Sequence, residues 1–538
     1  MRVINYLYIS VIILLGYACS LDRNPLVEYA EDEFWTTEEN AELALTAIYR
    51  GKISTGVEYS PYDWWSYGGL VLLELASDNG YDRRGRSSGF HKMTDGTLLS
   101  NNPFIKNYWA NSYAKIARCN RFLEEIENLQ PSEKVNRLKA EARFLRACQY
   151  FYLSQYFGDV PLVLSTLTAD EANHVEKEKK ETIVNFCIQE FTETANFLPQ
   201  FKDLTESEVG RASKQASLAF LGRILLAEKR YKEAIDAYKN IIDLGENIID
   251  PDYESIFLQS NENSAENIFS MQYVQDLFGS GLPQHAFPVK DGGWCLINST
   301  SSLFEAYRFT DGTMFDYNNP LYDPQDLGKN RDPRLGYTLL YNGALFGDSE
   351  WICHPDINSP DQIMSGQTTQ TGFLIRKYMD PYFKGDKNSY GANIPIIRYA
   401  EVLLSYLEAK IENGDNINQE LLDLTINQLR KRASVNMPIV KETDREKLRV
   451  IVRNERQVEL AMEGVRYWDL LRWGIAHEKL NGDVFGAPFP GSERVSLKPD
   501  GTLDKYGRWY VCTRRFRQNQ DYKWPIPQSE QDINPNLR

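Results

Sequence analysis

The sequence predicts a mainly α-helical protein, in which paired helices form a scaffold for a large, irregular, loop-rich part. Apolar residues recur at three- and four-residue spacing in segments 37–50, 108–157 and 211–245, and the same spacing returns after residue 395. Between residues 251 and 394, Gly, Pro, Asn, Asp and aromatic residues dominate and apolar runs are brief. A chain of 538 residues with 42% hydrophobic composition is long enough to bury one large core or several interlocked cores.

The chain begins with a short apolar segment that predicts export. A mostly apolar run over residues 3–15 follows Arg2 and ends just before Cys19. The run is too short for a membrane span, and the small residue Ala18 precedes Cys19, as at the cleavage point of a signal peptide. A cysteine directly after the cleavage point is where lipid is attached in bacterial lipoproteins. We therefore expect a signal peptide over 1–18 and a lipidated N-terminus and tether over 19–36, with a plain secretory signal as the alternative.

Three helices are predicted in the first part of the mature chain. Thr37 is a good N-cap residue for a helix over 37–50. A helix pair follows at 108–129 and 132–157, and Ser132 can cap its second member. Short connections of this kind place consecutive helices side by side, so these segments supply neighbours for later helices.

Residues 211–245 carry the clearest helical pattern. Two short helices are separated by a break at 229–231, with a small residue where they cross and an aromatic residue in the groove between them. This spacing is typical of a tetratricopeptide unit, which needs neighbouring helices to cover its apolar face. The face is formed by Leu218, Leu221, Gly222 and Leu225 in the first helix and by Ala234, Tyr238 and Ile241 in the second.

Helices return in the last quarter of the chain, and the tail from residue 484 is predicted to be loop-like and aromatic. The predicted helices cover 395–412, 418–434 and 444–474. The mature chain thus divides into an N-terminal helical region over 37–250, a variable loop-rich region over 251–394, and a C-terminal helical region with its tail over 395–538.

The composition excludes several classes of partner. The net charge is −15 and there is no Lys/Arg tract, so nucleic acid is not expected to bind. No cysteines are spaced as C-x-x-C, which removes the usual zinc and redox motifs. No cofactor is expected; calcium is possible because the loops are rich in Asp, but no EF-hand pattern supports it. Cys295 and Cys353 lie in loop-like regions, where a disulfide between them is possible.

Three segments resemble the RagB/SusD family of outer-membrane nutrient-binding lipoproteins of the Bacteroidetes. Their order and spacing agree with the family, as does the predicted lipoprotein start. The segments are AEARFLRACQYFYLSQYFGDVPLV at 140–163, RNERQVELAMEGVRYWDLLRWG at 453–474 and YKWPIPQSEQDINPNL at 522–537.

The resemblance implies a cell-surface protein, anchored in the outer membrane by its lipid, that captures a glycan and has no catalytic activity. Its partner would be a SusC-like TonB-dependent transporter, to which it delivers the oligosaccharide. The fold implied is a scaffold of tetratricopeptide-like helix pairs, and the irregular region would carry the ligand site.

The charges at 453–474 are interpreted as structural. Glu455, Glu459 and Glu463 are four residues apart and share a helix face. Arginines of the same segment, Arg456, Arg466 and Arg472, are expected to offset them with bidentate pairs. We therefore interpret this segment as a structural helix that joins the C-terminal part to the scaffold. We do not interpret its carboxylates as a catalytic array.

Ligand-binding candidates rest on chemistry and location alone, because the family's sites come from variable loops. Sugar binding needs an aromatic face for stacking and nearby polar groups for hydroxyls. Loops 59–92 and 275–355 combine both, and Trp294 and Tyr81 are the preferred stacking residues. The candidates are Trp64, Trp65, Tyr67, Asn79, Tyr81, Asp82, Arg83, Arg84, Trp294, Asn298, Tyr322 and Trp351.

Other interpretations remain open at this point. The basic run 82–92 is either a solvated loop or, with Arg83, Arg84 and Arg86, a site for an anionic sugar. A surface glycoside hydrolase would need only two suitably spaced carboxylates, although the chain contains no G-x-S-x-G, H-E-x-x-H or Walker motif. A protein-interaction scaffold of tetratricopeptide type, or a receptor for a non-sugar nutrient, would use the same fold.

Overall fold

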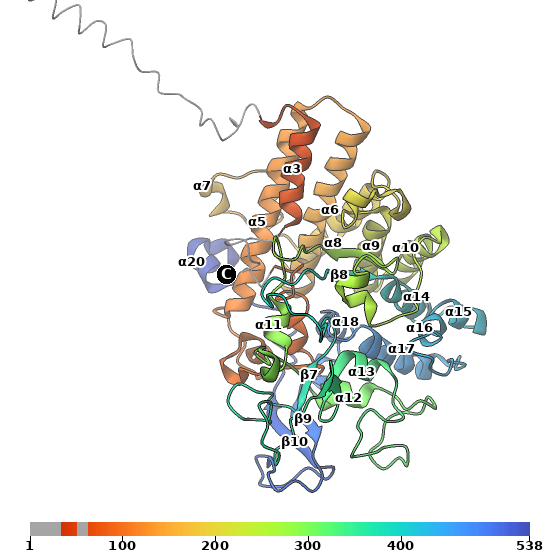
Figure 1. Cartoon of the computed structure of the whole chain (residues 1–538). Coiled ribbons are helices and arrows are strands. Elements are labelled where there is room, and N and C mark those ends of the chain that lie inside the picture. The colour runs from red at the N-terminus through yellow and green to blue at the C-terminus, as the bar shows by residue number, and fades with distance from the viewer. Residues whose placement is uncertain (1–33, 51–62) are drawn as a thin grey trace, which may run out of the picture.

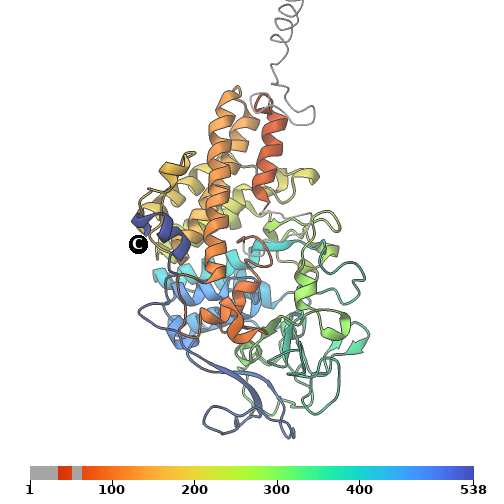
Figure 2. The ribbon, with the colours of Figure 1, turned by 90° about the vertical axis from the view of Figure 1, so that its left-hand side faces the viewer.

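The computed structural model describes residues 34–50 and 63–538. Cys19, with the predicted signal peptide and most of the tether, lies outside the described residues. The described chain is mainly α-helical, as the sequence predicts. In Figures 1 and 2, the helices of the first half stand together at one end, and the loops and short strands of residues 251–394 gather towards the other.

The long helices pack in sequence, each against the next, so that every helix has a neighbour for its apolar face (Figure 1). The predicted caps are present: Thr37 accepts a hydrogen bond from Asn40 N, and Ser132 accepts one from Val135 N. The series consists of α3 (Glu38–Tyr49), α5 (Pro103–Glu125), α6 (Glu133–Tyr156), α8 (Lys180–Thr194), α9 (Lys214–Ala227), α10 (Tyr231–Leu244), α14 (Tyr399–Asn413) and α17 (Arg445–Glu459).

The tetratricopeptide-like unit predicted at 211–245 is formed by α9 and α10. Gly222 lies where the two helices cross, and a Cβ atom there would come within 2.4 Å of Cε1 in the Tyr238 ring. Lys229 makes the break between the helices with a positive φ of 59°. The small residue at the crossing and the aromatic ring in the groove therefore have the roles that their spacing predicts.

Two predicted helix boundaries in the last quarter of the chain are wrong. The segment expected to begin a helix at Pro395 first forms strand β8 (Ile394–Arg398). The helix expected over 444–474 is interrupted after α17, because Met462 and Gly464 have positive φ values of 63° and 76°. The remaining helices are α4 (Gly89–Lys92), α7 (Ala169–Ala172), α11 (Leu282–Ala286), α12 (Ser301–Ala306), α13 (Arg334–Thr338), α15 (Gln419–Leu424), α16 (Ile426–Arg430), α18 (Arg466–Arg472), α19 (Ala476–Lys479) and α20 (Gln528–Ile533).

Short antiparallel strands tie distant loops together. The four-stranded sheet has the order β1-β3-β7-β4, and in it Tyr81 pairs with Asn298. The tail, predicted as a loop, instead contains the antiparallel pair β9–β10. Its strand pairing is interrupted by two register shifts. The strands are β1 (Gly80–Asp82), β2 (Asn267–Met271), β3 (Ile297–Ser299), β4 (Leu339–Tyr341), β5 (Leu345–Phe346), β6 (Ser349–Glu350), β7 (Phe373–Ile375), β9 (Gly482–Pro488) and β10 (Arg508–Arg514), and β2 pairs with β8.

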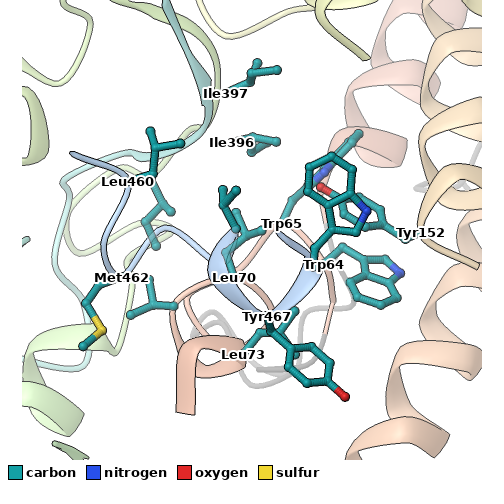
Figure 3. Close-up of a cluster of buried hydrophobic side chains, with 14 of the residues drawn as sticks. Trp64, Trp65, Leu70, Leu73, Tyr152, Ile396, Ile397, Leu460, Met462 and Tyr467 are labelled. Atoms are coloured by element: carbon teal, nitrogen blue, oxygen red, sulfur yellow. The ribbon is translucent and has the colours of Figure 1, made fainter. Parts of the chain in front are cut away.

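Much of the region predicted as a long ligand-binding loop is buried instead. Residues 63–82 run through the centre of the molecule, where Trp64, Trp65 and Leu70 meet Tyr152 of α6 and Tyr467 of α18 (Figure 3). Trp64 stacks on Tyr108 and Tyr152 at centroid distances of 4.2 and 4.6 Å. This segment joins the N-terminal helices to the C-terminal ones.

The carboxylates of 453–474 are structural, although their partners differ from those expected. Glu455, Glu459 and Glu463 are buried and paired with basic residues from other elements: Arg334, Lys377, Arg398, Arg430 and Arg432. The arginines proposed for them are used elsewhere: Arg456 and Arg472 hold Asp469 and Glu408, and Arg466 holds Asp78. The network thus joins the C-terminal helices to the loop-rich region and to residues 63–82.

Glu74 provides a pH-dependent contribution to stability. Its buried carboxyl accepts hydrogen bonds from Arg466 N at 3.1 Å and Asn79 Nδ2 at 3.0 Å. Burial raises the pKa of Glu74 from 4.5 to about 7, against the lowering effect of these bonds. Between these pH values the folded chain keeps a proton that the unfolded chain releases, so the free energy of unfolding falls as pH rises through this window.

Replacing Glu74 with Gln is expected to remove this dependence. The wild type should lose about 3 kcal/mol relative to the variant between pH 4.5 and 7. Urea unfolding of both proteins at several pH values measures the difference. A difference that does not change with pH would show that Glu74 is ionised throughout.

Candidate functional site

Trp294 is exposed at the end of a tightly bonded loop. Its N–H donates to the Gln284 carbonyl of α11 at 2.8 Å, and the Gln284 side chain donates to the Gly292 carbonyl at 3.0 Å. Gly292 has a φ of 80°, and a Cβ atom on Gly293 would lie 2.2 Å from the Phe287 oxygen. The two glycines therefore allow the turn that holds the Trp294 side chain, 44% exposed, out from the loop.

His285 lies beside this ring and provides a polar neighbour. The two ring centroids are 4.8 Å apart in an edge-to-face arrangement, and Tyr67 lies on another side of His285 at 5.2 Å. Burial lowers the pKa of His285, and the nearby Arg84 lowers it further, so the ring is neutral at pH 7. Nδ1 lies 2.9 Å from the Gly281 carbonyl and must carry the proton, which leaves Nε2 as a hydrogen-bond acceptor.

This arrangement is better suited to binding a sugar than to catalysing a reaction. An exposed indole offers a flat apolar face for ring C–H groups, and a neutral imidazole accepts a hydrogen bond from a hydroxyl. The negative charge of Asp82 acts to raise the pKa of His285, but Asp82 itself is buried. Its carboxylate pairs with Arg84 at 2.7 Å and accepts a hydrogen bond from Ser88 Oγ at 2.5 Å. Its carboxylate is therefore committed to structural hydrogen bonds.

Most of the other candidates lie in the interior, where neighbouring side chains cover them. Trp64, Trp65, Tyr67, Tyr81 and Trp351 are at most 6% exposed, which removes them as open stacking surfaces in this conformation. Their apolar rings are better satisfied by the core than by water, and pattern alone does not distinguish a core aromatic residue from a ligand platform.

The candidate amides are also used internally. Asn79 donates to Glu74 and accepts from Gln457 at 2.9 Å. Asn298 donates to the Cys295 carbonyl and accepts from Gln370 N, both at 2.8 Å. Tyr322 is half-buried against Phe315. Asn298, in β3, thus holds the end of the Trp294 loop at Cys295, whereas the Asn79 side chain links Glu74 to Gln457 of α17.

The basic loop is less available than its sequence suggests. Arg84 is paired with Asp82, and the backbone of Arg83 bonds to the Leu296 carbonyl at 3.1 Å. Arg83 is half-buried and Arg86 is exposed. The three arginines therefore do not form one open anion site, although Arg83, just after β1, is bonded to the end of the Trp294 loop.

The two loop cysteines are free thiols buried in the loop-rich region. Cys295 lies 4.0 Å from Asp361 Oδ1, and Cys353 donates to the Gly372 carbonyl at 3.5 Å. The disulfide that the sequence allows between Cys295 and Cys353 is therefore not formed in this structure. Within residues 34–50 and 63–538, the side chains of His, Cys, Asp and Glu do not gather in threes as a metal site would require.

Sequence reasoning selected Trp294 as a candidate but did not select its neighbours. His285 and Gln284 precede it by about ten residues and carry no motif of their own. Only the turn at Gly292 and Gly293 folds them against it. In the part of the chain that the structure describes, no helix is both long and apolar enough to cross a membrane.

Comparison with known proteins gives matches over nearly the whole chain. Residues 253–538 match the model of the SusD family, and residues 77–226 match the model described as starch-binding associating with outer membrane. A SusD-like protein, P2, of Formosa agariphila is 23% identical over 98% of this chain and 97% of its own length. The starch-binding protein SusD of Bacteroides thetaiotaomicron is 24% identical over 76% of this chain and 77% of its own.

A solved structure agrees with the fold at higher identity. The SusD-like carbohydrate-binding protein of Bacteroides fragilis is 51% identical, covers 94% of this chain and 100% of its own, and superposes with a TM-score of 0.91. The match of one family model to more than half of the sequence, together with this structure, assigns the family. The chain belongs to the SusD family.

Proposed function

We propose that this protein is a non-catalytic cell-surface lipoprotein that captures a glycan and delivers it to a SusC-like TonB-dependent transporter. Family membership supports binding of carbohydrate at the outer membrane, since relatives are described as starch-binding or carbohydrate-binding. The lipid would be carried by Cys19, beyond the described residues. The helical regions 37–250 and 395–538 would form the scaffold, and region 251–394 would carry the ligand site.

The single observation that carries the proposal is the exposed Trp294 beside the neutral His285. The loop that presents this ring is fixed by four backbone and side-chain hydrogen bonds, from Trp294, Cys295, Leu296 and Gln284. A ring fixed in this way loses little conformational entropy when a sugar stacks on it.

Replacing Trp294 with Ala is expected to weaken glycan binding at least tenfold, because the stacking face and its buried area are lost. Affinity electrophoresis of the soluble protein through laminarin, starch, xylan and polygalacturonate gels measures the effect. Thermal stability should change little, since the side chain is 44% exposed.

The matched control is Phe197→Ala, which removes another exposed aromatic ring, 53% exposed, just after α8. This variant should migrate as the wild type does in every gel. Equal retardation of the Trp294 and Phe197 variants would remove Trp294 from the site. Release of labelled sugars from any of the four polysaccharides would instead favour an enzyme.

A further inference from the structure

We propose that Tyr382 is a second aromatic platform of the same binding surface, so that the glycan contacts two rings presented by two loops. This inference rests on the proposed function and adds to it a residue that sequence reasoning did not select. Tyr382 is 59% exposed, more than Trp294.

The Tyr382 side chain is held in a fixed orientation. Its backbone N–H donates to Asp380 Oδ1 at 2.9 Å, which closes a tight turn. Its hydroxyl donates to Asp348 Oδ1 at 3.2 Å, on the turn between β5 and β6. The ring is therefore tied at both ends while much of its surface stays open, which favours stacking with a ligand.

The Tyr382 loop and the Trp294 loop are bonded to each other. Gln284 N–H donates to the Lys387 carbonyl at 3.1 Å, while the Gln284 carbonyl accepts from Trp294. Beneath this contact, the Phe287 ring meets Phe346 at 5.2 Å and the Lys387 ammonium at 5.3 Å. One buried aromatic residue thus supports the segments that present both exposed rings.

The β5–β6 hairpin makes a second connection between them. Lys290, in the Trp294 loop, donates to Ser349 Oγ at 2.7 Å and to the Glu350 carbonyl at 3.1 Å. The neighbouring Asp348 accepts the bond from Tyr382. Two connections therefore hold the segment that carries Tyr382 against the segment that carries Trp294.

The segments that connect the two rings offer polar groups suited to sugar hydroxyls. Glu350, Asp386 and Asn388 are exposed, and Lys387 is half-buried. The carboxylate of Asp348 raises the pKa of Tyr382, so its phenol stays protonated and keeps its bond. Apolar faces flanked by carboxylates and amides match a glycan, whose rings present C–H groups and hydroxyls together.

The experiment compares Tyr382→Ala, Tyr382→Phe and Phe197→Ala with the wild type in laminarin, starch, xylan and polygalacturonate gels. In whichever gel slows the wild type, Tyr382→Ala should weaken binding roughly tenfold. Tyr382→Phe keeps the ring and should stay within about twofold, because only one hydrogen bond to a charged but exposed group is lost. Phe197→Ala should match the wild type.

The outcomes separate this inference from the proposed function. If Trp294→Ala abolishes retardation and Tyr382→Ala does not alter it, the second platform is overturned and the proposed function stands. If Tyr382→Phe is as weak as Tyr382→Ala, a ring without its hydroxyl does not support binding, and a platform that acts by stacking is overturned. If the wild type passes all four gels unretarded, both the proposed function and the second platform fail.

Discussion

Replacing Glu459 with Ala is expected to lower the free energy of unfolding by about 3–5 kcal/mol. The carboxylate is fully buried and accepts hydrogen bonds from Arg334 at 2.8 Å, Arg432 at 2.9 Å and Arg398 at 3.2 Å. Burial alone would raise the pKa of Glu459, but these three guanidinium groups outweigh it and hold the pKa well below its usual range. Glu459 is therefore ionised at neutral pH.

The cost arises from the charges that the substitution leaves behind. Arg334, Arg398 and Arg432 are each at most 3% exposed, so they cannot recover the lost interaction from water. They come from α13, from the end of β8 and from just after α16, so the carboxylate holds three separate segments against α17. Their mutual repulsion is then only partly offset by Glu266, Glu455, Glu463 and Asp332.

Urea unfolding of the wild type and of Glu459→Ala measures the loss, and Asp243→Ala is the control. Asp243 pairs with Lys239 on α10, but both side chains are more than half exposed, so removal of this pair should change stability by less than about 0.5 kcal/mol. A loss below about 1 kcal/mol for Glu459→Ala would contradict the account of a buried, mutually dependent network.

This network shows what could be predicted from the sequence and what could not. The spacing of Glu455 and Glu459 correctly placed them on one face of a helix, and their density correctly indicated a structural role. The partners were wrong because Arg334 and Arg398 lie more than sixty residues away in the sequence. Short-range spacing describes a helix face, but long-range pairing depends on which elements the fold brings against it.

The same limit applies to the candidate ligand residues. Trp64 and Trp294 both occur in segments rich in Gly, Asp and aromatic residues, so composition alone does not distinguish them as candidate ligand residues. The structure buries the first beneath α5 and α6 and exposes the second. For Trp294 the two preceding glycines are a usable signal, because such a pair favours a sharp turn. Tyr382 had no such signal, since the hydrogen-bond acceptor for its hydroxyl is Asp348, 34 residues away in the sequence.

Replacing Trp64 with Ala is therefore expected to act on stability, whereas the same substitution at Trp294 acts on binding. Trp64 is completely buried, and its Nε1 donates to Ser112 Oγ at 2.7 Å. Its ring stacks on Tyr108 and Tyr152, and Trp524 of the C-terminal tail lies 6.0 Å away in the same stack. Removing the indole leaves a large cavity and an unpaired hydroxyl, at a cost of about 3–5 kcal/mol.

Urea unfolding of the two Trp→Ala variants, together with their migration in polysaccharide gels, tests this contrast. Trp64→Ala should unfold at a clearly lower urea concentration and, under conditions where it is folded, should be retarded like the wild type. Trp294→Ala should show the opposite pattern, since its ring is 44% exposed and makes few core contacts. Wild-type stability for Trp64→Ala would mean that the stack joining α5, α6 and the tail contributes little. A loss of binding by the folded Trp64 variant would mean that residues 63–82 transmit the state of the core to the ligand surface through β1 and β3.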